Sequence, residues 1–422
     1  MREAEILNYL PAIKTKSVPT GIIFHRVGLI IFLVVLFVAL EQNIHSFTVL
    51  ISFVLALALI ARAVSKVMLF KVHCRLSLPQ RHFFPQDAAV VNIEIANNKF
   101  VPLFWIHAAI PIPAGITIAD VNDDDGLDGQ PEIPELTFDF SMEAFSVAEF
   151  HPAIVCSRRG YYPLNKLTLT SGDLFGLYSQ RAEFINEEAL VVYPRLYPIK
   201  DLDIFSLYPT GGVCFKEHLF YDHTRTMGVR DYCTSDEFRH IHWKASARRD
   251  RLQVKIFEPT VMGQMALFLP AEEFCMEDEL ETAICVLAAI AHRAIEQGNS
   301  VGLISNCSLK DSGKPAAIFP DGNKNKMDIL LETFAKINPR AEGRWELFFT
   351  SVLNSLRPGT TFVFAATQWG EPVLRSIMTL KRAGYKVVVV HPGIRKDNPL
   401  RGEVAAYKYE LRNGYIQCEL QQ

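Results

Sequence analysis

The residues whose types could support chemistry gather in one polar stretch, residues 228–252, which reads GVRDYCTSDEFRHIHWKASARRDRL. It holds six basic and four acidic residues around one Trp and two His, in a chain that is 49% hydrophobic. A hydrolase would use His242 or His240 as the base and Ser246 as the nucleophile. A His four residues from a Ser is common by chance, and the sequence contains no G-x-S-x-G, H-E-x-x-H or G-x-x-x-x-G-K-[ST] motif. A hydrolase site is therefore one alternative, and any ATP-driven work would need a partner.

The same stretch carries charges that can pair with one another. The basic residues Arg230, Arg239, Lys244 and Arg248 lie near the acidic residues Asp231, Asp236, Glu237 and Asp250. One interpretation is an ion-paired brace between two domains, because Arg bound to a carboxylate through two hydrogen bonds fixes orientation. The residues of this brace would be Asp236, Arg239, Trp243 and Arg248. The other is an exposed basic and aromatic surface for an acidic partner or ligand, since residues 225–255 hold eight basic and four acidic side chains.

The local structure of the stretch depends on how its apolar residues repeat. As a strand, residues 240–248 would place every second side chain on one face, namely Ile241, Trp243, Ala245 and Ala247. As a helix capped by Ser235 or Asp236, the inward side chains would be Phe238, Ile241 and Ala245. We expect a short helix followed by a strand. The alternating residues of that strand are Leu252, Val254 and Ile256.

Two apolar runs lie near the N-terminus, at residues 22–40 and 46–63. Each reaches the roughly 20 residues that cross a bilayer only when its flanks are counted. A signal peptide is disfavoured, because no small-residue cleavage site follows the first run and the second begins a few residues later. A buried soluble hairpin is the other alternative. We expect two short transmembrane helices joined by a tight turn, after a cytoplasmic segment at residues 1–21.

Positive charges flank both predicted helices at their outer ends. The first is preceded by Lys14, Lys16 and Arg26, and the second is followed by Arg62, Lys66, Lys71 and Arg75. The joining turn carries Glu41 and no Lys or Arg. Because cytoplasmic flanks carry the excess of Lys and Arg, we expect a multi-pass protein of the cytoplasmic (inner) membrane whose soluble domains face the cytoplasm. Eight scattered cysteines without a C-x-x-C pair agree with reduced thiols there.

The soluble part divides into two patterns. Residues 70–200 contain short runs of alternating polarity, separated by turn signals at the spacing of a β-sandwich. From residue 258 to 415, short apolar runs alternate with amphipathic helices, of which residues 277–298 give the clearest example. This alternation predicts a mostly parallel sheet covered on both faces. The fold class is thus multidomain: a transmembrane helical hairpin, a β-sandwich, a junction segment at residues 201–257 and an α/β domain.

Charge and motifs limit the classes of partner. The net charge is −3, so the overall balance does not indicate nucleic acid, and Trp243 with its neighbouring arginines is too small a basic stripe to change that. The cysteines and histidines lack metal-ligand spacing, and we expect no cofactor.

At residues 228–259 the sequence resembles the signature of the bacterial domain of unknown function 58 family. The matching residues are Gly228, Arg230, Tyr232, Asp236, Arg239, Ile241, Trp243, Lys244, Ser246, Ala247, Arg248, Leu252 and Glu258. The upstream blocks SRRGYYPL, SGDLFGLY and VVYPRL also match, in the family's order. Ser235 replaces the Gly that usually precedes the Asp, so the turn there is expected to differ.

The resemblance implies an architecture and a partner. The α/β domain of such proteins resembles the von Willebrand factor A fold, whose metal site needs D-x-S-x-S after the first strand. Here Pro270 and Ala271 occupy the required positions, so we expect no metal site, despite Glu272 and Glu273 nearby. Family members look like membrane-anchored partners of MoxR-type AAA+ ATPases that assemble or activate other proteins. The resemblance attaches no reaction to the fold.

These observations together predict a membrane-anchored, non-enzymatic scaffold or adaptor. It would dock a MoxR-type AAA+ ATPase, or that ATPase's client protein, at the cytoplasmic membrane face. The partner-binding residues would be Arg230, Tyr232, Asp236, Arg239, His242, Trp243, Lys244, Ser246 and Arg248. The alternative is a ligand-binding protein or a hydrolase with a site built from residues 228–252.

Overall fold

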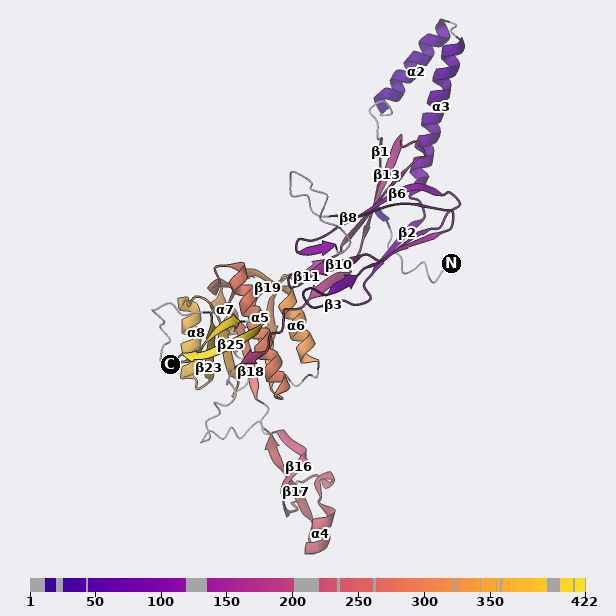
Figure 1. Ribbon diagram of the computed structural model, residues 1–422. Helices are drawn as coiled ribbons and strands as arrows, with labels where there is room; N and C mark the ends of the chain where they lie inside the picture. Colours follow the sequence, from indigo (N-terminus) through magenta and orange to yellow (C-terminus); the bar gives the residue numbers. More distant parts are fainter. Residues whose placement is uncertain are drawn as a thin grey trace. The chain divides into compact units, whose positions relative to one another are not determined.

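The structure is a computed structural model of the 422-residue chain (Figure 1). It describes residues 12–19, 26–42, 45–118, 135–200, 220–233, 236–260, 263–321, 323, 325–341, 343–353, 355–356, 359–392, 403–412 and 414–421. Residue contacts divide the chain into an N-terminal unit, Met1–Pro194, and a C-terminal unit, Arg195–Gln422. Ser235 and residues 201–219 of the predicted junction segment lie outside the described residues.

Two apolar helices stand in the N-terminal unit, α2 (Arg26–Glu41) and α3 (His45–Met68). At 1.5 Å per residue, the 24 residues of α3 extend about 36 Å, enough for a hydrocarbon core of about 30 Å. The 16 residues of α2 reach only about 24 Å. Of the described helices, α3 alone is long and apolar enough to cross a membrane. Most of its apolar side chains point outward, as on a helix that faces lipid.

The last turns of α3 leave the apolar run and join the β-strands. Ser65 and Met68 are buried, and the helix packs against strands β12 (Lys166–Gly172) and β13 (Tyr178–Ile185). The backbone N–H of Leu69 donates to Oε1 of Gln180 at 3.3 Å. The ammonium of Lys99 donates to the carbonyl of Met68, which satisfies one carbonyl at the helix end. The helix therefore extends past the predicted limit at residue 63, because tertiary contacts replace lipid there.

Between residues 72 and 192 the described part of the chain forms strands and no helix. One sheet has the order β1-β13-β12-β6-β8, formed by Ala12–Pro19, Tyr178–Ile185, Lys166–Gly172, Leu103–Pro111 and Glu135–Met142. Three smaller sheets are β2-β5-β9 (Val72–Ser77, Asn92–Asn97, Val147–Phe150), β4-β10-β7 (Ala88–Val90, Ala153–Cys156, Ile116–Ile118) and β11-β14-β3 (Gly160–Pro163, Ala189–Val192, His82–Phe83). Alternating apolar side chains from these strands share one core, so the prediction of a β-rich domain after the helices is confirmed.

Strand β1 was not predicted. Residues 12–19 belong to the segment expected to precede the helices as a cytoplasmic tail, but they pair antiparallel with β13, with Pro19 opposite Tyr178. The expected tail is therefore partly an edge strand of the largest sheet in this unit. The pairing brings the chain to the sheet's end just before it enters α2.

Lys99 gives a pH dependence that can be measured. Burial lowers the pKa of its ammonium from 10.5 to about 8. Between these values the unfolded chain binds more protons than the folded chain, so the stability of the N-terminal unit is expected to rise as the pH rises from 8 to 10.5. Thermal unfolding of the full chain in detergent across this range checks the sign. Lys99→Met should flatten the rise, and equal slopes for the two proteins would contradict the assignment.

The C-terminal unit contains a nine-stranded mixed sheet with the order β15-β25-β24-β23-β22-β18-β19-β20, and β21 pairs separately with β19. In that order the strands are Ile199–Lys200, Tyr415–Gln421, Ala405–Arg412, Lys386–His391, Thr361–Ala365, Gln264–Leu269, Ser300–Leu309 and Pro315–Ile318, with β21 at Ile337–Ala341. The five strands from β24 to β19 run parallel. The parallel α/β core was predicted, whereas β15 and most of β25 fall outside the predicted range of 258–415.

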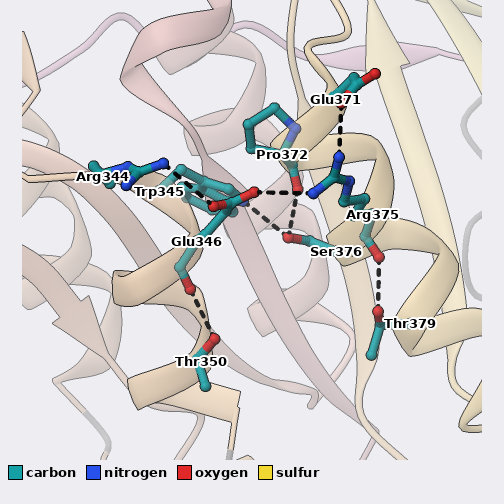
Figure 2. A network of polar contacts seen from close by, with 9 residues as sticks. All are labelled: Arg344, Trp345, Glu346, Thr350, Glu371, Pro372, Arg375, Ser376 and Thr379. Carbon is teal, nitrogen blue, oxygen red and sulfur yellow. Dashed lines mark hydrogen bonds and ion pairs between the residues drawn. The ribbon is translucent and has the colours of Figure 1, made fainter.

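Four helices cover this sheet: α5 (Glu277–Glu296), α6 (Lys326–Lys336), α7 (Trp345–Leu353) and α8 (Glu371–Arg382) (Figure 1). Helices α7 and α8 pack on one face through a core of buried aromatic and aliphatic side chains. Trp345 ties the two helices together, because its indole N–H donates to the hydroxyl of Ser376 at 3.1 Å (Figure 2). On the surface above it, Arg375 lies 3.7 Å from a carboxylate oxygen of Glu346. A buried contact and an exposed ion pair thus hold α7 against α8.

Candidate functional site

The polar stretch singled out from the sequence forms the end of a long β-hairpin. Strand β16 (Phe220–Asp231) pairs antiparallel with β17 (Gln253–Thr260), and the closing pair is Asp231 with Gln253. A 3-10 turn η2 (Phe238–His240) and the helix α4 (Trp243–Arg249) lie between the strands (Figure 1). Ile241 bridges to Val254, and both side chains are buried. We call residues 228–256 the signature hairpin.

The predicted order of a short helix and then a strand is confirmed, but the predicted cap is wrong. Helix α4 begins after His242, whose ring Nδ1 accepts the backbone N–H of Ala245 at 3.1 Å. It ends at Asp250, which adopts a left-handed conformation with φ of 53°. The cap was expected at Ser235 or Asp236, at least six residues earlier. The intervening residues fold instead as a loop and η2, because Asp236 is engaged by Arg230.

Gln253 is the centre of the hairpin and was missed by the sequence analysis. It is fully buried. Its amide Nε2 donates to the carboxylate of Asp231, and its Oε1 accepts from Arg249 at 3.2 Å. Its backbone carbonyl accepts the N–H of His242 at 2.8 Å, which closes the hairpin around α4. A polar residue at the first position of a strand is not recognisable in the sequence as a buried residue. Only the folded structure shows that several segments of the hairpin meet at Gln253.

Ser246 has a structural role in this arrangement. Its hydroxyl accepts the backbone N–H of Gln253 at 2.8 Å and donates to the carbonyl of His242 at 3.1 Å. The side chain is buried. The ring of His242 accepts from Ala245 rather than from Ser246. The hydrogen bond between base and nucleophile that a hydrolase needs is therefore not formed by these described residues.

Arg230 and Asp236 form an ion pair inside the hairpin. Arg230 Nη1 donates to Asp236 Oδ2 at 2.7 Å and Nη2 donates to Oδ1 at 2.5 Å. The hydrogen bonds from Arg230, and then that from the backbone N–H of Cys233, hold the pKa of Asp236 below its ordinary value. The pair joins the end of β16 to the loop before η2. It stabilises the shape of the loop within the hairpin.

The other predicted members of a brace are exposed. The side chain of Arg239 is 73% exposed and pairs with Glu237, two residues away. Trp243 is 67% exposed and Arg248 lies open on α4. A brace requires buried arginines paired across elements, and the described contacts of Arg239 are local. Trp243, Lys244 and Arg248 instead form an open face of α4.

Exposed apolar side chains accompany this face. Phe238 was expected to point inward on a helix, but it is 69% exposed and stacks at a tilt on Tyr232, with ring centroids 5.7 Å apart. Leu252 and Ile256 are also open, whereas Val254, the third residue of the predicted alternation, is buried. The signature hairpin therefore displays aromatic and basic side chains around a rigid polar interior. Such surfaces are typical of protein-binding sites.

A second group of residues in the C-terminal unit lies where a von Willebrand factor A domain would hold a metal ion. The loops after β18 and β22 meet at the carboxyl ends of the central parallel strands, where α/β sheets bind ligands. Buried Glu273 lies there, and its carboxylate accepts the N–H of Gly370 at 2.7 Å. Burial raises the pKa of Glu273, although the Gly370 hydrogen bond opposes this. A Cβ on residue 370 would lie 2.6 Å from Glu273 Oε1, so a larger residue there would displace this carboxylate.

The metal site of a von Willebrand factor A domain does not fit these residues. Pro270 and Ala271 supply no side-chain ligand at the positions where Asp and Ser would be needed. The backbone N–H of Ala271 donates instead to Oδ1 of Asn306 at 2.8 Å. Among the described residues, no group of three or more His, Cys, Asp or Glu side chains could hold a metal ion. We therefore assign no chemistry to a metal here.

Comparison with known proteins assigns part of the chain to a family. Residues 228–347 match the model of the family described as "Protein of unknown function DUF58", from the signature hairpin to the start of α7. The "Uncharacterized protein YeaD" of Bacillus subtilis is 31% identical over 163 residues, which cover 38% of this chain and 38% of that protein. The chain thus carries the DUF58 region, and the predicted family assignment is confirmed. The match with YeaD spans well under half of its length.

Solved structures add nothing to this assignment. An exo-β-N-acetylglucosaminidase of Vibrio harveyi is 10% identical, with 82% of this chain and 63% of that chain covered and a TM-score of 0.19. A β-glucuronidase of Bacteroides uniformis is 10% identical, with 75% and 33% covered and a TM-score of 0.17. Less than two thirds of each enzyme is covered. At such TM-scores neither likeness bears on fold or function.

Proposed function

We propose that this protein is a membrane-anchored, non-enzymatic adaptor whose signature hairpin docks a partner protein. Trp243, exposed beside Lys244 and Arg248 on α4, is the observation that carries the proposal. Trp and Arg are the side chains that most often dominate binding energy when a partner covers them. The buried contacts of Gln253 and Ser246 keep this face in shape without a partner, which lowers the entropic cost of binding.

The family resemblance supplies the class of partner in this proposal. It indicates a MoxR-type AAA+ ATPase or that ATPase's client protein, and this chain has no nucleotide-hydrolysis motif of its own. The hydrolase alternative is weakened by the engagement of Ser246 with backbone groups. Docking would hold the ATPase at the membrane, so that its ATP hydrolysis in the cytoplasm could act on membrane-bound client proteins.

The proposal includes an orientation and a fold. Both α2 and α3 would cross the cytoplasmic membrane. The strands of the N-terminal unit and the whole C-terminal unit would lie in the cytoplasm, because Arg62, Lys66 and Lys71 follow the apolar run of α3. The nine-stranded part of the C-terminal unit would be a von Willebrand factor A-like domain that lacks the metal site. Its central parallel strands between two helical layers support this.

Co-purification of the full chain from its native membranes tests the docking. We expect a AAA+ ATPase, identified by mass spectrometry, to be recovered with the wild type and lost with Trp243→Ala. The affinity should fall by about 30-fold or more, since a central Trp contributes about 2 kcal/mol or more to an interface.

Phe100→Ala provides the matched control, because Phe100 is an exposed aromatic residue of the N-terminal unit. It should leave recovery of the ATPase unchanged, and thermal unfolding should show that both variants fold. Recovery that is equal for Trp243→Ala and the wild type would contradict docking through this face. Recovery of no ATPase with the wild type would contradict the class of partner.

A further inference from the structure

The turn between β12 and β13, residues 173–177 of the SGDLFGLY block, is built as a rigid support. Asp173 is buried, and its carboxylate accepts the backbone N–H of Tyr178 at 2.7 Å and that of Phe175 at 3.0 Å. The indole N–H of Trp105 donates to the carbonyl of Asp173 at 3.1 Å. Gly176 adopts a left-handed φ of 67°, which a side chain would strain. The turn is therefore held in one conformation.

This rigid turn presents two large apolar side chains to the outside. Leu174 is 60% exposed and Phe175 is 61% exposed. Asp173 holds the backbone on both sides of them, so they cannot fold back into the core without breaking its hydrogen bonds. An ordered pair of exposed apolar residues at a loop tip indicates a surface that is covered by something apolar.

The neighbours of the turn indicate what covers it. Gln180, two residues into β13, accepts the N–H of Leu69 at the end of α3. Tyr178, the first residue of β13 after the turn, lies close to Arg62. Burial raises the pKa of the Tyr178 phenol, and the positive charge of Arg62 lowers it by a smaller amount. Arg62 is the first charged residue after the apolar run of α3. The turn thus lies beside the point where α3 changes from apolar to basic, which is where a spanning helix meets the headgroups.

The strand that precedes α2 also ends beside Tyr178. Pro19 at the end of β1 pairs with Tyr178, and the chain then continues to α2. The end of β1, which leads to α2, and the end of α3 therefore both lie near residues 173–178. Basic side chains that follow the apolar run, Arg62 and Lys66, add attraction for anionic headgroups on this side.

We propose that Leu174 and Phe175 insert into the lipid headgroup and acyl-chain boundary, as a third membrane contact beside α2 and α3. The inference rests on the membrane anchoring in the proposed function. An apolar tip continuous with a membrane helix fits a bilayer surface because Leu and Phe are stabilised at that boundary. The contact would fix the angle of the β domain against the membrane, in addition to the anchoring by α2 and α3.

Lipid photolabelling of the full chain tests the proposal. The chain is reconstituted in vesicles of phosphatidylcholine and phosphatidylglycerol that carry a diazirine on the acyl chain near the glycerol, and labelled peptides are mapped by mass spectrometry. We expect label on residues 173–177 and on α3. Leu174→Ser combined with Phe175→Ser should lose the label on the turn and retain the label on α3.

Ile185→Ser is the matched control. Ile185 is an exposed apolar residue of the same strand, at the end of β13 away from the turn, about 23 Å along the strand from Tyr178. The region around residue 185 should carry no label, and Ile185→Ser should leave the label on the turn and on α3 unchanged. Label on α3 with none on the wild-type turn overturns this inference and leaves membrane anchoring intact. Label on neither overturns both, and these wild-type results do not depend on how the variants fold.

Discussion

Replacing Trp345 by Ala is expected to destabilise the α/β part of the C-terminal unit by about 3 to 5 kcal/mol. The indole is fully buried, and its centroid lies 6.0 Å from the rings of Phe268 and Phe349. Truncation would leave a cavity among aromatic rings that belong to a strand and a helix, and such rings cannot all move in to fill it. Urea unfolding followed by circular dichroism measures the loss, with the transition of this unit analysed separately from that of the N-terminal unit.

Two control variants separate the causes of that loss. Ser376→Ala removes the acceptor of the indole N–H and should cost about 1 kcal/mol, since the packing is kept (Figure 2). Leu347→Ala changes an exposed residue of the same helix and should cost less than about 0.5 kcal/mol. A cost for Trp345→Ala no greater than that for Ser376→Ala would show that the packing of the ring contributes little.

The α/β part of the fold could be predicted because its signals are local. Residues 277–296 carry small and aliphatic side chains at helical spacing, and Gly298 with φ of 81° follows the helix end. The strand from Gln264 to Leu269 is an apolar run between turns, as expected for a parallel strand buried on both faces. Each element could be recognised from fewer than 25 residues of sequence.

Strand β1 could not be predicted for the opposite reason. Its sequence, AIKTKSVP, has two lysines and a proline and no clear alternation. Its partner is β13, more than 150 residues later in the chain. The pairing is favourable because β13 offers an open edge beside the helices. The eight residues of β1 contain no signal that predicts pairing with this edge.

The signature hairpin lies between these cases. The motif located the residues, and the apolar pattern predicted a helix followed by a strand. The same pattern placed Phe238 inward, but Phe238 is exposed. Gln253 and Val254 are both buried although they are adjacent in β17. The Gln253 amide is engaged by Arg249 and Asp231, and Val254 is paired with Ile241 in a β-bridge. Phe238 in η2 and Trp243 in α4 are both exposed.

This distribution separates the residues that shape the hairpin from those that face outward. Gln253, Ser246 and Asp236 use their polar groups on neighbouring segments within the hairpin. Trp243, Lys244 and Arg248 are exposed. A substitution in the first group should change folding and binding together, whereas one in the second should change binding alone. The two groups therefore give different results in one pair of measurements.

Replacing Gln253 by Leu is expected to open the signature hairpin locally. The change keeps a side chain of similar size but removes the acceptor of Arg249 and the donor to Asp231. Each of these two hydrogen bonds contributes roughly 0.5 to 1.5 kcal/mol, so the loss of both costs about 1 to 3 kcal/mol. Hydrogen exchange of the amides of residues 241–254 should therefore become roughly 5- to 150-fold faster, while exchange in α5 stays unchanged.

Arg248→Ala and Trp243→Ala are the comparison variants, because both residues are exposed on α4. Neither should change hydrogen exchange in the hairpin, and Trp243→Ala should still lose the partner. Gln253→Leu should lose the partner as well, since the face of α4 is then no longer held in place. Unchanged exchange in Gln253→Leu would show that the backbone pairing of β16 with β17 suffices, and that the buried amide does not hold the hairpin closed. Faster exchange in Trp243→Ala would show that its indole supports the fold, and the loss of a partner in that variant could then not be assigned to a docking surface.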